Sequence, residues 1–249
     1  MASGKDRQER AARAEQMRRE REKAQRRQRN LLAIGIVVVV VALIAFAAFA
    51  ITRESEPQDV VAPQSVDGNS IAYTPEDAGG TANDPVTVTL YEDFQCPFCA
   101  QLEQQVAPEL MTMVEAGDIT MEYRPIAFLD RQSENEYASR ALNASLCVLD
   151  EGGVSAWKKM HDLLYASQPA EGTAGPDDDA LIATAKQAGV EGIDSCITDR
   201  AFGPWGERAT DDATGADGFP GTPWVQVDGK TVDNPTLDEI RAAIKAAGA

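Results

Sequence analysis

Hydrophobic and polar positions alternate over residues 86–91 of this chain, and this pattern predicts a β-strand. Apolar side chains then recur at helical spacing over residues 100–114, and alternation returns over residues 119–126. A strand, a helix and a second strand in this order predict a crossover unit.

The pattern then becomes helical, and we expect a helical insert over residues 133–213. Ser133 and Glu136 are spaced as a capping box that opens the first helix of the insert, and the glycine pair at 152–153 ends it. A second helix follows and ends before Pro169. The insert therefore separates the crossover unit from the C-terminal part of the domain.

The C-terminal part adds one more helix and then returns to a strand pattern. The acidic run at 177–179 indicates the start of a helix rather than a calcium site, because no spaced acceptors follow it. This third helix ends before Gly189. A strand is expected over residues 224–227, a turn at 228–229 and a last helix over 237–247. Together the elements predict an α/β domain with a small mixed sheet covered by helices.

Charge divides the chain at a long apolar run. Residues 1–30 carry a net charge of +6 and the rest of the chain −23, within a total of −17. Residues 31–51 contain no charge and are long enough to cross about 30 Å of hydrocarbon as one helix. The basic N-terminal flank places the N-terminus in the cytoplasm. We therefore predict a basic cytoplasmic arm, a single transmembrane helix that serves as a signal anchor in the cell membrane, and an extracytoplasmic C-terminal domain.

A cleaved signal peptide is the alternative, because residues 48–50 resemble a cleavage site of small residues. The apolar run is longer than the usual signal-peptide run of about 7 to 15 residues, which favours a retained anchor. Nucleic-acid binding by residues 1–30 is not expected, because they contain no aromatic side chain for base stacking. Residues 52–84 are polar and without a sustained period, which predicts a flexible linker.

The strongest chemical signal is a Cys-Pro-Phe-Cys motif at residues 96–99, between the first strand and the first helix. Cys96 falls at the helix N-terminus, where unpaired N–H groups and the helix dipole favour a thiolate. Cys99 lies one turn deeper, within reach of a disulfide with Cys96. We interpret the pair as a redox dithiol, with Cys96 as the more exposed nucleophile and Cys99 as the resolving partner. A structural disulfide or half of a zinc site is the alternative.

The other two cysteines, Cys147 and Cys196, are 49 residues apart in the helical insert. In an exported domain cysteines are expected to pair, so we predict a structural disulfide between them. A four-cysteine zinc site is the alternative, although these isolated residues lack the paired spacing that zinc sites show. We predict no metal.

Four segments, in the same order, resemble the DsbA family of thioredoxin-fold disulfide oxidoreductases. They are Phe94 to Cys99, Trp157 to Leu164, the Gly221-Thr222-Pro223 triplet and the Asp228-Gly229 turn. The resemblance covers residues 85–249 and implies a thioredoxin fold with a helical insertion.

The resemblance also implies a substrate site. Pro223 is expected to follow a cis peptide bond beside Cys96, which leaves the backbone of Thr222 to pair with an extended substrate. Trp224, directly after Pro223, is expected to line the same groove. Pro97 suits the first helical turn, whereas Phe98 stands where strongly oxidising members have a histidine that stabilises the thiolate. We therefore predict a lowered Cys96 pKa in the middle or upper part of the range of about 3.5 to 7.5.

The chain departs from the family at the residue that moves protons. Many members carry a buried acid six residues before the first active-site cysteine, and here that residue is Leu90. Glu92 and Asp93 lie nearer the motif, but the sequence does not settle whether either points inward. His161, the one histidine, lies on an apolar helix face and is expected to be a packing residue rather than a catalytic partner.

These features predict a membrane-anchored thiol-disulfide oxidoreductase that oxidises the thiols of exported proteins. The resemblance implies a membrane reoxidase, DsbB-like or of the vitamin K epoxide reductase type, that passes electrons to quinone, and it requires no bound cofactor. Two alternatives remain: a reductase or cytochrome-maturation thiol donor with the same fold, and a non-catalytic binding module at the membrane.

Overall fold

The computed structural model describes residues 40, 41, 43 and 60–248, and the last of these ranges belongs to the second of two compact units, residues 59–249. Among the described residues, none of the helices has the length and apolar character needed to cross a membrane. The predicted arm at 1–30 and nearly all of the predicted transmembrane helix at 31–51 lie outside the described residues. The fold described below is that of the second unit.

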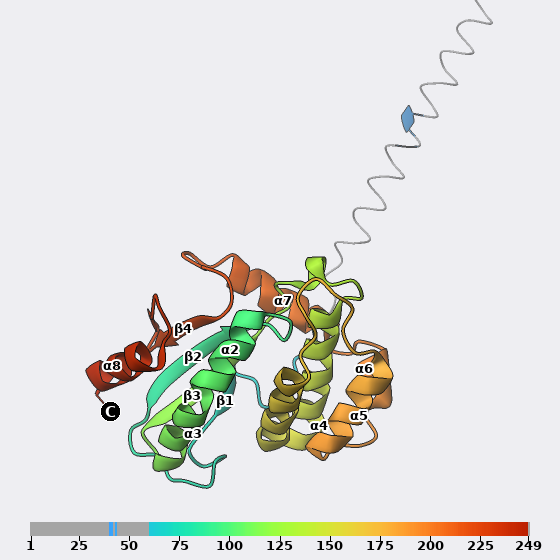
Figure 1. Ribbon diagram of the computed structural model, residues 1–249. Coiled ribbons are helices and arrows are strands. Elements are labelled where there is room, and N and C mark those ends of the chain that lie inside the picture. Colours follow the sequence, from blue (N-terminus) through green and yellow to red (C-terminus); the bar gives the residue numbers. More distant parts are fainter. Residues whose placement is uncertain (1–39, 42, 44–59, 249) are drawn as a thin grey trace, which may run out of the picture. The chain divides into compact units, whose positions relative to one another are not determined.

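Five strands form one mixed sheet in the order β1-β3-β2-β4-β5 (Figure 1). The central strand β2 (Val86–Glu92) pairs in parallel with β3 (Ile119–Pro125) and antiparallel with β4 (Trp224–Val227). The short strands β1 (Ile71–Tyr73) and β5 (Lys230–Thr231) form the two edges. The parallel pairing of β2 with β3 confirms the predicted crossover unit, and the C-terminal strand and turn are also confirmed.

The predicted linker at 52–84 is wrong from residue 60 onward, because β1 lies inside it. Ile71 is fully buried and pairs with Tyr123 of β3. A strand of three residues is too short to show a period of two in the sequence, and β1 is stabilised by its pairing with β3. Residues 52–59 lie outside the described residues.

The helix expected over residues 100–114 is divided into α2 (Pro97–Gln105) and α3 (Ala107–Ala116), which meet at Val106. Pro108 explains the break, because proline has no N–H to donate one turn back and its ring clashes with the carbonyl there. Both helices lie over the sheet, with α2 beginning beside the end of β2 (Figure 1). The break leaves α2 as a short helix that carries the cysteine motif at its start.

The two helices predicted on either side of the glycine pair form one kinked helix, α4 (Tyr137–Ala166), with the kink at Gly153 (φ 73°). The predicted capping box is wrong. The residue before α4 is Glu136 in a left-handed conformation, and the hydroxyl of Ser133 accepts a hydrogen bond from the first helical N–H, that of Tyr137, at 2.8 Å. The start of α4 is therefore fixed by one serine contact rather than by a reciprocal pair.

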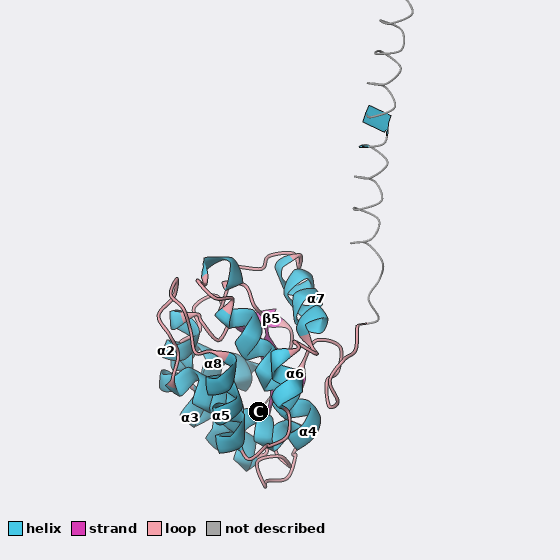
Figure 2. Ribbon diagram, turned by 90° about the vertical axis from the view of Figure 1, so that its right-hand side faces the viewer, coloured by secondary structure: helices cyan, strands magenta, loops and turns pink. Residues whose placement is uncertain are grey.

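Three more helices complete the insert: α5 (Asp178–Ala188), α6 (Asp194–Thr198) and α7 (Gly203–Thr214). Helices α4, α5 and α6 lie side by side (Figure 2). The carboxylate of Asp177 accepts the N–H of Ala180 at 3.0 Å, which confirms the acidic run as a helix start.

Alternate residues of β2 face two hydrophobic clusters. Leu90 belongs to the main core, together with apolar residues of α3, α4 and the C-terminal helix α8 (Leu237–Ala247). Tyr91 packs instead with Trp224 and with Ala213 of α7 in a smaller cluster. Since side chains alternate along a strand, Glu92 follows Leu90 on the main-core side. The bounds of α8 are those predicted.

A disulfide joins Cys147 of α4 to Cys196 of α6, as predicted, and it excludes the four-cysteine zinc site. Asn143 ties the same helices together. Its amide nitrogen donates to the carbonyl oxygens of Cys196 and Ile197, each at 3.2 Å, and its amide oxygen accepts the N–H of Phe202 at 2.9 Å. The bridge therefore reinforces a junction that hydrogen bonds already hold.

Removal of this bridge is expected to destabilise the helical insert. In the chain-entropy model, a cross-link closing a loop of 49 residues contributes about 4 kcal/mol, so the full chain with Cys147→Ala and Cys196→Ala should lose about this much free energy of unfolding. Chemical denaturation measures it. As the control, a thiol reductant should lower the stability of the wild type to nearly that of the variant. Equal free energies of unfolding of the wild type and the variant without reductant would contradict the prediction.

Candidate active site

The cysteine motif begins where β2 ends and α2 starts. Cys96 is the N-cap residue of α2 and Pro97 occupies the first turn, as predicted. Asp93 shapes the turn before them, because its carboxylate accepts the N–H of Gln95 at 2.7 Å and that of Leu129 at 2.8 Å. Burial raises the pKa of Asp93 to about 7, although the two N–H donors oppose the rise. The carboxylate of Asp93 holds the turn in place through the hydrogen bonds that it accepts from the backbone N–H groups of Gln95 and Leu129.

Two glutamine side chains fasten the same turn to a distant segment of the chain. The amide nitrogen of Gln168 donates to the carbonyl oxygens of Phe94 and Cys96, at 3.1 and 2.9 Å. The amide nitrogen of Gln95 donates in the opposite direction, to the carbonyl of Thr173 at 3.0 Å. Sequence reasoning missed Gln168, because its partners are more than 70 residues away and no local pattern marks them.

The structure holds Cys96 and Cys99 as free thiols, and both are nearly covered, with exposed fractions of 3% and 1%. Cys96 is the more exposed of the two, as expected, but only by a small margin. The loop that contains Thr222 and Pro223 approaches Cys96, and the carbonyl oxygen of Thr222 accepts a hydrogen bond from the protonated Cys96 Sγ at 3.3 Å. The exposed residue of the motif is Phe98, at 65%.

The two thiols nevertheless differ in acidity. A hydrogen bond from the Cys99 thiol lowers the pKa of Cys96 to about 6, against the opposing effect of burial. The side chain of Thr222 and the backbone N–H groups of Cys99 and Phe98 lower it further. This value lies in the predicted range. Burial raises the pKa of Cys99 well above 9, and the neighbouring Cys96 raises it further. At neutral pH Cys96 is therefore a thiolate and Cys99 a thiol, which suits a nucleophile and a resolving partner.

The peptide bond between Thr222 and Pro223 is cis, as the resemblance implied. A groove of about 490 Å³ lies beside it, and Thr222, Pro223 and the exposed Phe98 are among its lining residues. Trp224 does not belong to this lining. It is buried on the other side of β4, where its ring stacks on Tyr91 at 4.6 Å. The predicted substrate contact of Trp224 is therefore wrong, because the strand register turns it toward the smaller cluster.

A buried group of ionisable residues lies near Cys99. Glu92 and His161 are both fully buried, and the His161 Nε2 lies 3.0 Å from one Glu92 carboxylate oxygen. The hydroxyl of Tyr165 donates to the other oxygen at 3.1 Å. His161 also packs against aromatic rings, as predicted, but the ion pair with Glu92 gives it a charged role that the apolar helix face did not indicate.

Both nitrogens of His161 face carboxylates, since its Nδ1 lies 3.0 Å from Asp162. Burial opposes a charge here, but Glu92, Glu103 and Asp162 together raise the pKa of His161 to about 10. Donor atoms of Glu92, Glu103 and His161 lie within 4.8 Å of one another, a spacing that metal sites also show. Within the cluster, His161 and Glu92 form an ion pair.

Glu103 is the member of this cluster that sequence reasoning overlooked. The signal was present, because residues four apart on a helix share a face and Glu103 follows Cys99 by four. Burial raises the pKa of Glu103 to about 7. Its carboxyl group therefore titrates in the range in which a thiol-disulfide enzyme works.

Comparison with known proteins identifies relatives of the described domain. A family model described as thioredoxin matches residues 75–246. Two solved structures are similar over most of their length. The disulfide bond oxidoreductase DsbG of Mycobacterium tuberculosis is 31% identical with a TM-score of 0.63, covering 74% of this chain and 90% of that one. DsbA of the same organism is 30% identical with a TM-score of 0.62, covering 73% and 94%.

Among curated proteins, the chain is 31% identical to the serine/threonine-protein kinase PknE of Mycobacterium tuberculosis over 163 residues, 62% of this chain and 29% of the kinase. It is 32% identical to the Na(+)/H(+) antiporter NhaA 1 of Salinispora arenicola over 171 residues, 68% of this chain and 24% of the antiporter. The chain thus spans less than a third of the length of these relatives.

Introducing a hydrogen-bond donor at the exposed motif position should make the Cys96 thiol more acidic. In the Phe98→His variant a protonated imidazole can stabilise the thiolate, so the pKa of Cys96 should fall clearly below the wild-type value of about 6. Thiolate absorbance, titrated on the full chain, measures the shift. The Phe98→Leu variant is the matched control and should keep the wild-type midpoint; an unchanged midpoint in Phe98→His would contradict the prediction.

Proposed function

Because the chain belongs to the thioredoxin family and is a DsbA-like protein disulfide oxidoreductase, we propose that Cys96 and Cys99 oxidise the thiols of exported proteins. The observation that carries this proposal is the opposite shift of the two thiol pKa values. A thiolate stabilised by the folded protein favours the reduced form of the enzyme, and an enzyme with a stable reduced form is an oxidant.

The size of this effect limits how strong an oxidant the protein is. At pH 7 a thiol with a pKa of about 6 is mostly ionised, and relative to an unshifted thiol this stabilises the reduced form by about 1.4 kcal/mol, equivalent to about 30 mV. Because the folded pKa is lowered, the contribution is complete above the ordinary thiol pKa and is lost as the pH falls through 6.

The reaction proceeds in two exchanges. A substrate thiolate attacks the Cys96 sulfur of the Cys96–Cys99 disulfide, which forms a mixed disulfide and releases Cys99. A second substrate thiolate attacks the substrate sulfur of the mixed disulfide, and Cys96 leaves as its stabilised thiolate. The substrate gains a disulfide, and the enzyme gains two electrons. The groove beside Pro223 gives an extended substrate segment a place next to Cys96.

Reoxidation completes the cycle. We assign it to a membrane reoxidase, DsbB-like or of the vitamin K epoxide reductase type, which takes the two electrons to quinone without a cofactor bound by this chain. The apolar run at 31–51 and the basic residues before it support a single-pass anchor that holds the domain outside the cytoplasm. An anchored enzyme stays close to such a partner, which raises the effective concentration of each for the other.

A reductase or cytochrome-maturation thiol donor is the second candidate, and one observation favours it. Phe98 offers no hydrogen bond to the thiolate, and a pKa of about 6 is nearer to that of thioredoxin, about 7, than to that of DsbA, about 3.5. The two candidates differ in the direction of electron flow and not in the residues that carry it.

The reduction potential separates the two. With the thiolate stabilised less than in DsbA and more than in thioredoxin, the full chain should equilibrate with glutathione at a potential between about −120 and −270 mV. Mass-spectrometric counting of free thiols across a series of glutathione ratios gives the value. A potential at or below the lower limit would contradict the oxidant assignment and support the reductase.

Catalysis itself is tested by peptide oxidation. The full chain with Cys96→Ser should lose oxidation of a two-cysteine peptide entirely, because the attacked sulfur is gone, while a folded adaptor would keep its binding. The Cys99→Ser variant is the matched comparison. Given the same peptide in its disulfide form, the Cys96 thiolate should attack the peptide disulfide, release one peptide thiolate and accumulate the mixed disulfide, because no resolving thiol is left on the enzyme. Peptide oxidation at the background rate in both wild type and Cys96→Ser would favour the non-catalytic binding module.

A further inference from the structure

Three side chains with metal-binding donor atoms converge from three different elements. They are Glu92 of β2, Glu103 of α2 and His161 of α4, and one donor atom of each lies within 4.8 Å of the other two. The His161 Nε2 lies 3.0 Å from a carboxylate oxygen of Glu92. Two ligands of one tetrahedral ion are roughly 3.3 Å apart when each is about 2.0 to 2.1 Å from it. The donors are therefore close enough to share one ion.

The side chains around these donors orient them as the surroundings of a metal site do. The carboxylate of Asp162 lies 3.0 Å from the His161 Nδ1, which directs the Nε2 toward Glu92. The hydroxyl of Tyr165 donates to the second carboxylate oxygen of Glu92 at 3.1 Å. A histidine ligand usually gives its other ring N–H to a carboxylate, and carboxylate ligands are themselves hydrogen-bonded. Both kinds of support are present here.

The charges of the cluster favour a divalent cation. Three carboxylates, those of Glu92, Glu103 and Asp162, surround the imidazole ring of His161. The cations among these groups are the His161 imidazolium and the ammonium of Lys158, which pairs with Asp162. One negative charge is therefore left over when all of them are ionised. A divalent ion that replaces the Nε2 proton of His161 balances this charge, and the proton goes to solvent.

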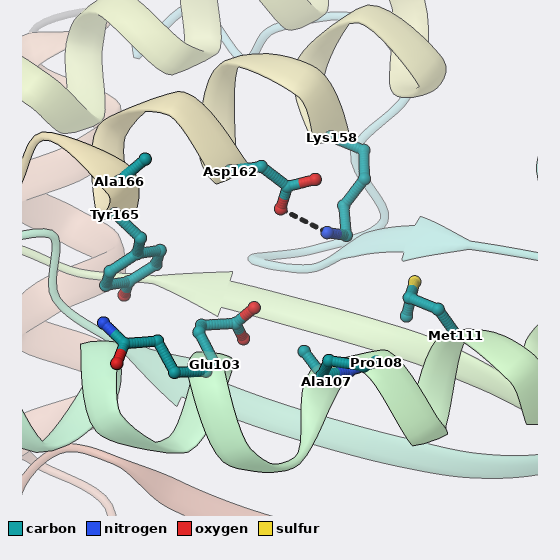
Figure 3. Close-up of a pocket in the computed structure, with 9 residues that line it drawn as sticks. Glu103, Ala107, Pro108, Met111, Lys158, Asp162, Tyr165 and Ala166 are labelled. Atoms are coloured by element: carbon teal, nitrogen blue, oxygen red, sulfur yellow. Dashed lines mark hydrogen bonds and ion pairs between the residues drawn. The ribbon is translucent and has the colours of Figure 1, made fainter.

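A pocket supplies an entrance and a free coordination position. It has a volume of about 330 Å³ and is lined by Glu103, Lys158 and Asp162 among others. Figure 3 shows Glu103 pointing from α2 into this pocket, across from the Lys158–Asp162 ion pair of α4. Three protein ligands with one open side are the arrangement of zinc sites that keep their fourth position for water or another ligand.

We propose that Glu92, Glu103 and His161 bind one divalent transition-metal ion, Zn²⁺ in preference to Ca²⁺ or Mg²⁺. Imidazole nitrogen suits Zn²⁺, whereas Ca²⁺ takes about six to eight oxygen ligands and Mg²⁺ keeps most of its waters. The bound ion joins β2, α2 and α4 without using Cys96 or Cys99, so the site does not depend on the proposed function. The prediction of no metal rested on the cysteines and the acidic run at 177–179, whereas these donors lie far apart in the sequence.

Calorimetric titration of Zn²⁺ into the full chain in mild detergent tests the site. The Cys96–Cys99 disulfide is kept closed, because free thiolates would themselves bind zinc. We expect one ion per chain. We also expect the Tm to rise as Zn²⁺ is added, because the ion binds the folded state. Ca²⁺ at the same concentration should not reproduce the rise, and an equal rise with Ca²⁺ would overturn the choice of ion.

Variants identify the ligands. Replacing a residue next to the ligands costs about 10- to 100-fold in metal affinity, so Asp162→Asn should weaken zinc binding by this factor. Glu103→Gln removes a ligand at a half-buried position and should weaken binding further, with loss of the Tm rise. Glu115→Gln, which changes an exposed carboxylate of α3, is the matched control and should bind as wild type does.

Two results would overturn the site. One is a wild-type Tm that does not respond to Zn²⁺, and the other is equal zinc affinity in wild type and Glu103→Gln. Neither measurement involves thiol exchange, so failure of the proposed function would leave both results unchanged.

Discussion

The chemistry of this protein depends on the burial of Cys99 directly beneath Cys96, one turn along α2. Because Cys99 is buried, it keeps its proton, and the hydrogen bond it donates stabilises the Cys96 thiolate. Cys96 is thereby a reactive thiolate, whereas Cys99 remains a protonated thiol. The surrounding contacts, from Asp93 within the turn and from Gln168 across it, keep the two sulfurs in this relation.

Much of this arrangement could be predicted from the sequence because it depends on local pattern. The strand alternation before the motif and the helical stripe after it place Cys96 at a helix start, whatever the rest of the fold does. The last helix, α8, has the bounds that its own periodicity indicates. The pairing of Cys147 with Cys196 follows from exclusion, since the motif cysteines are already matched with each other and an exported domain leaves few thiols unpaired.

The features that were not predicted depend on contacts between distant segments. Trp224 faces away from the groove because the register of β4 against β2 places its side chain in the smaller cluster. This register cannot be predicted from the position of Trp224 in the sequence alone. β1 is stabilised by its neighbour and carries no pattern of its own. The Glu92–His161 pair joins residues 69 apart, so each alone indicated only a strand end and a packed helix face. The break at Val106 is different, because Pro108 was visible in the sequence. The apolar residues at helical spacing were given more weight than this proline.

Local structure thus sets the acidity of Cys96, whereas tertiary packing brings together the buried Glu92–His161 ion pair. The central claim is that the two thiols of the reduced protein ionise separately. Carbon-13 NMR of the full chain labelled at the cysteine Cβ atoms follows each thiol by itself through a pH titration. The Cys96 signal should move with a midpoint of about 6, and the Cys99 signal should stay in place until the pH exceeds 9. Two signals that move together, with a shared midpoint near the ordinary thiol value of about 8.5, would contradict it.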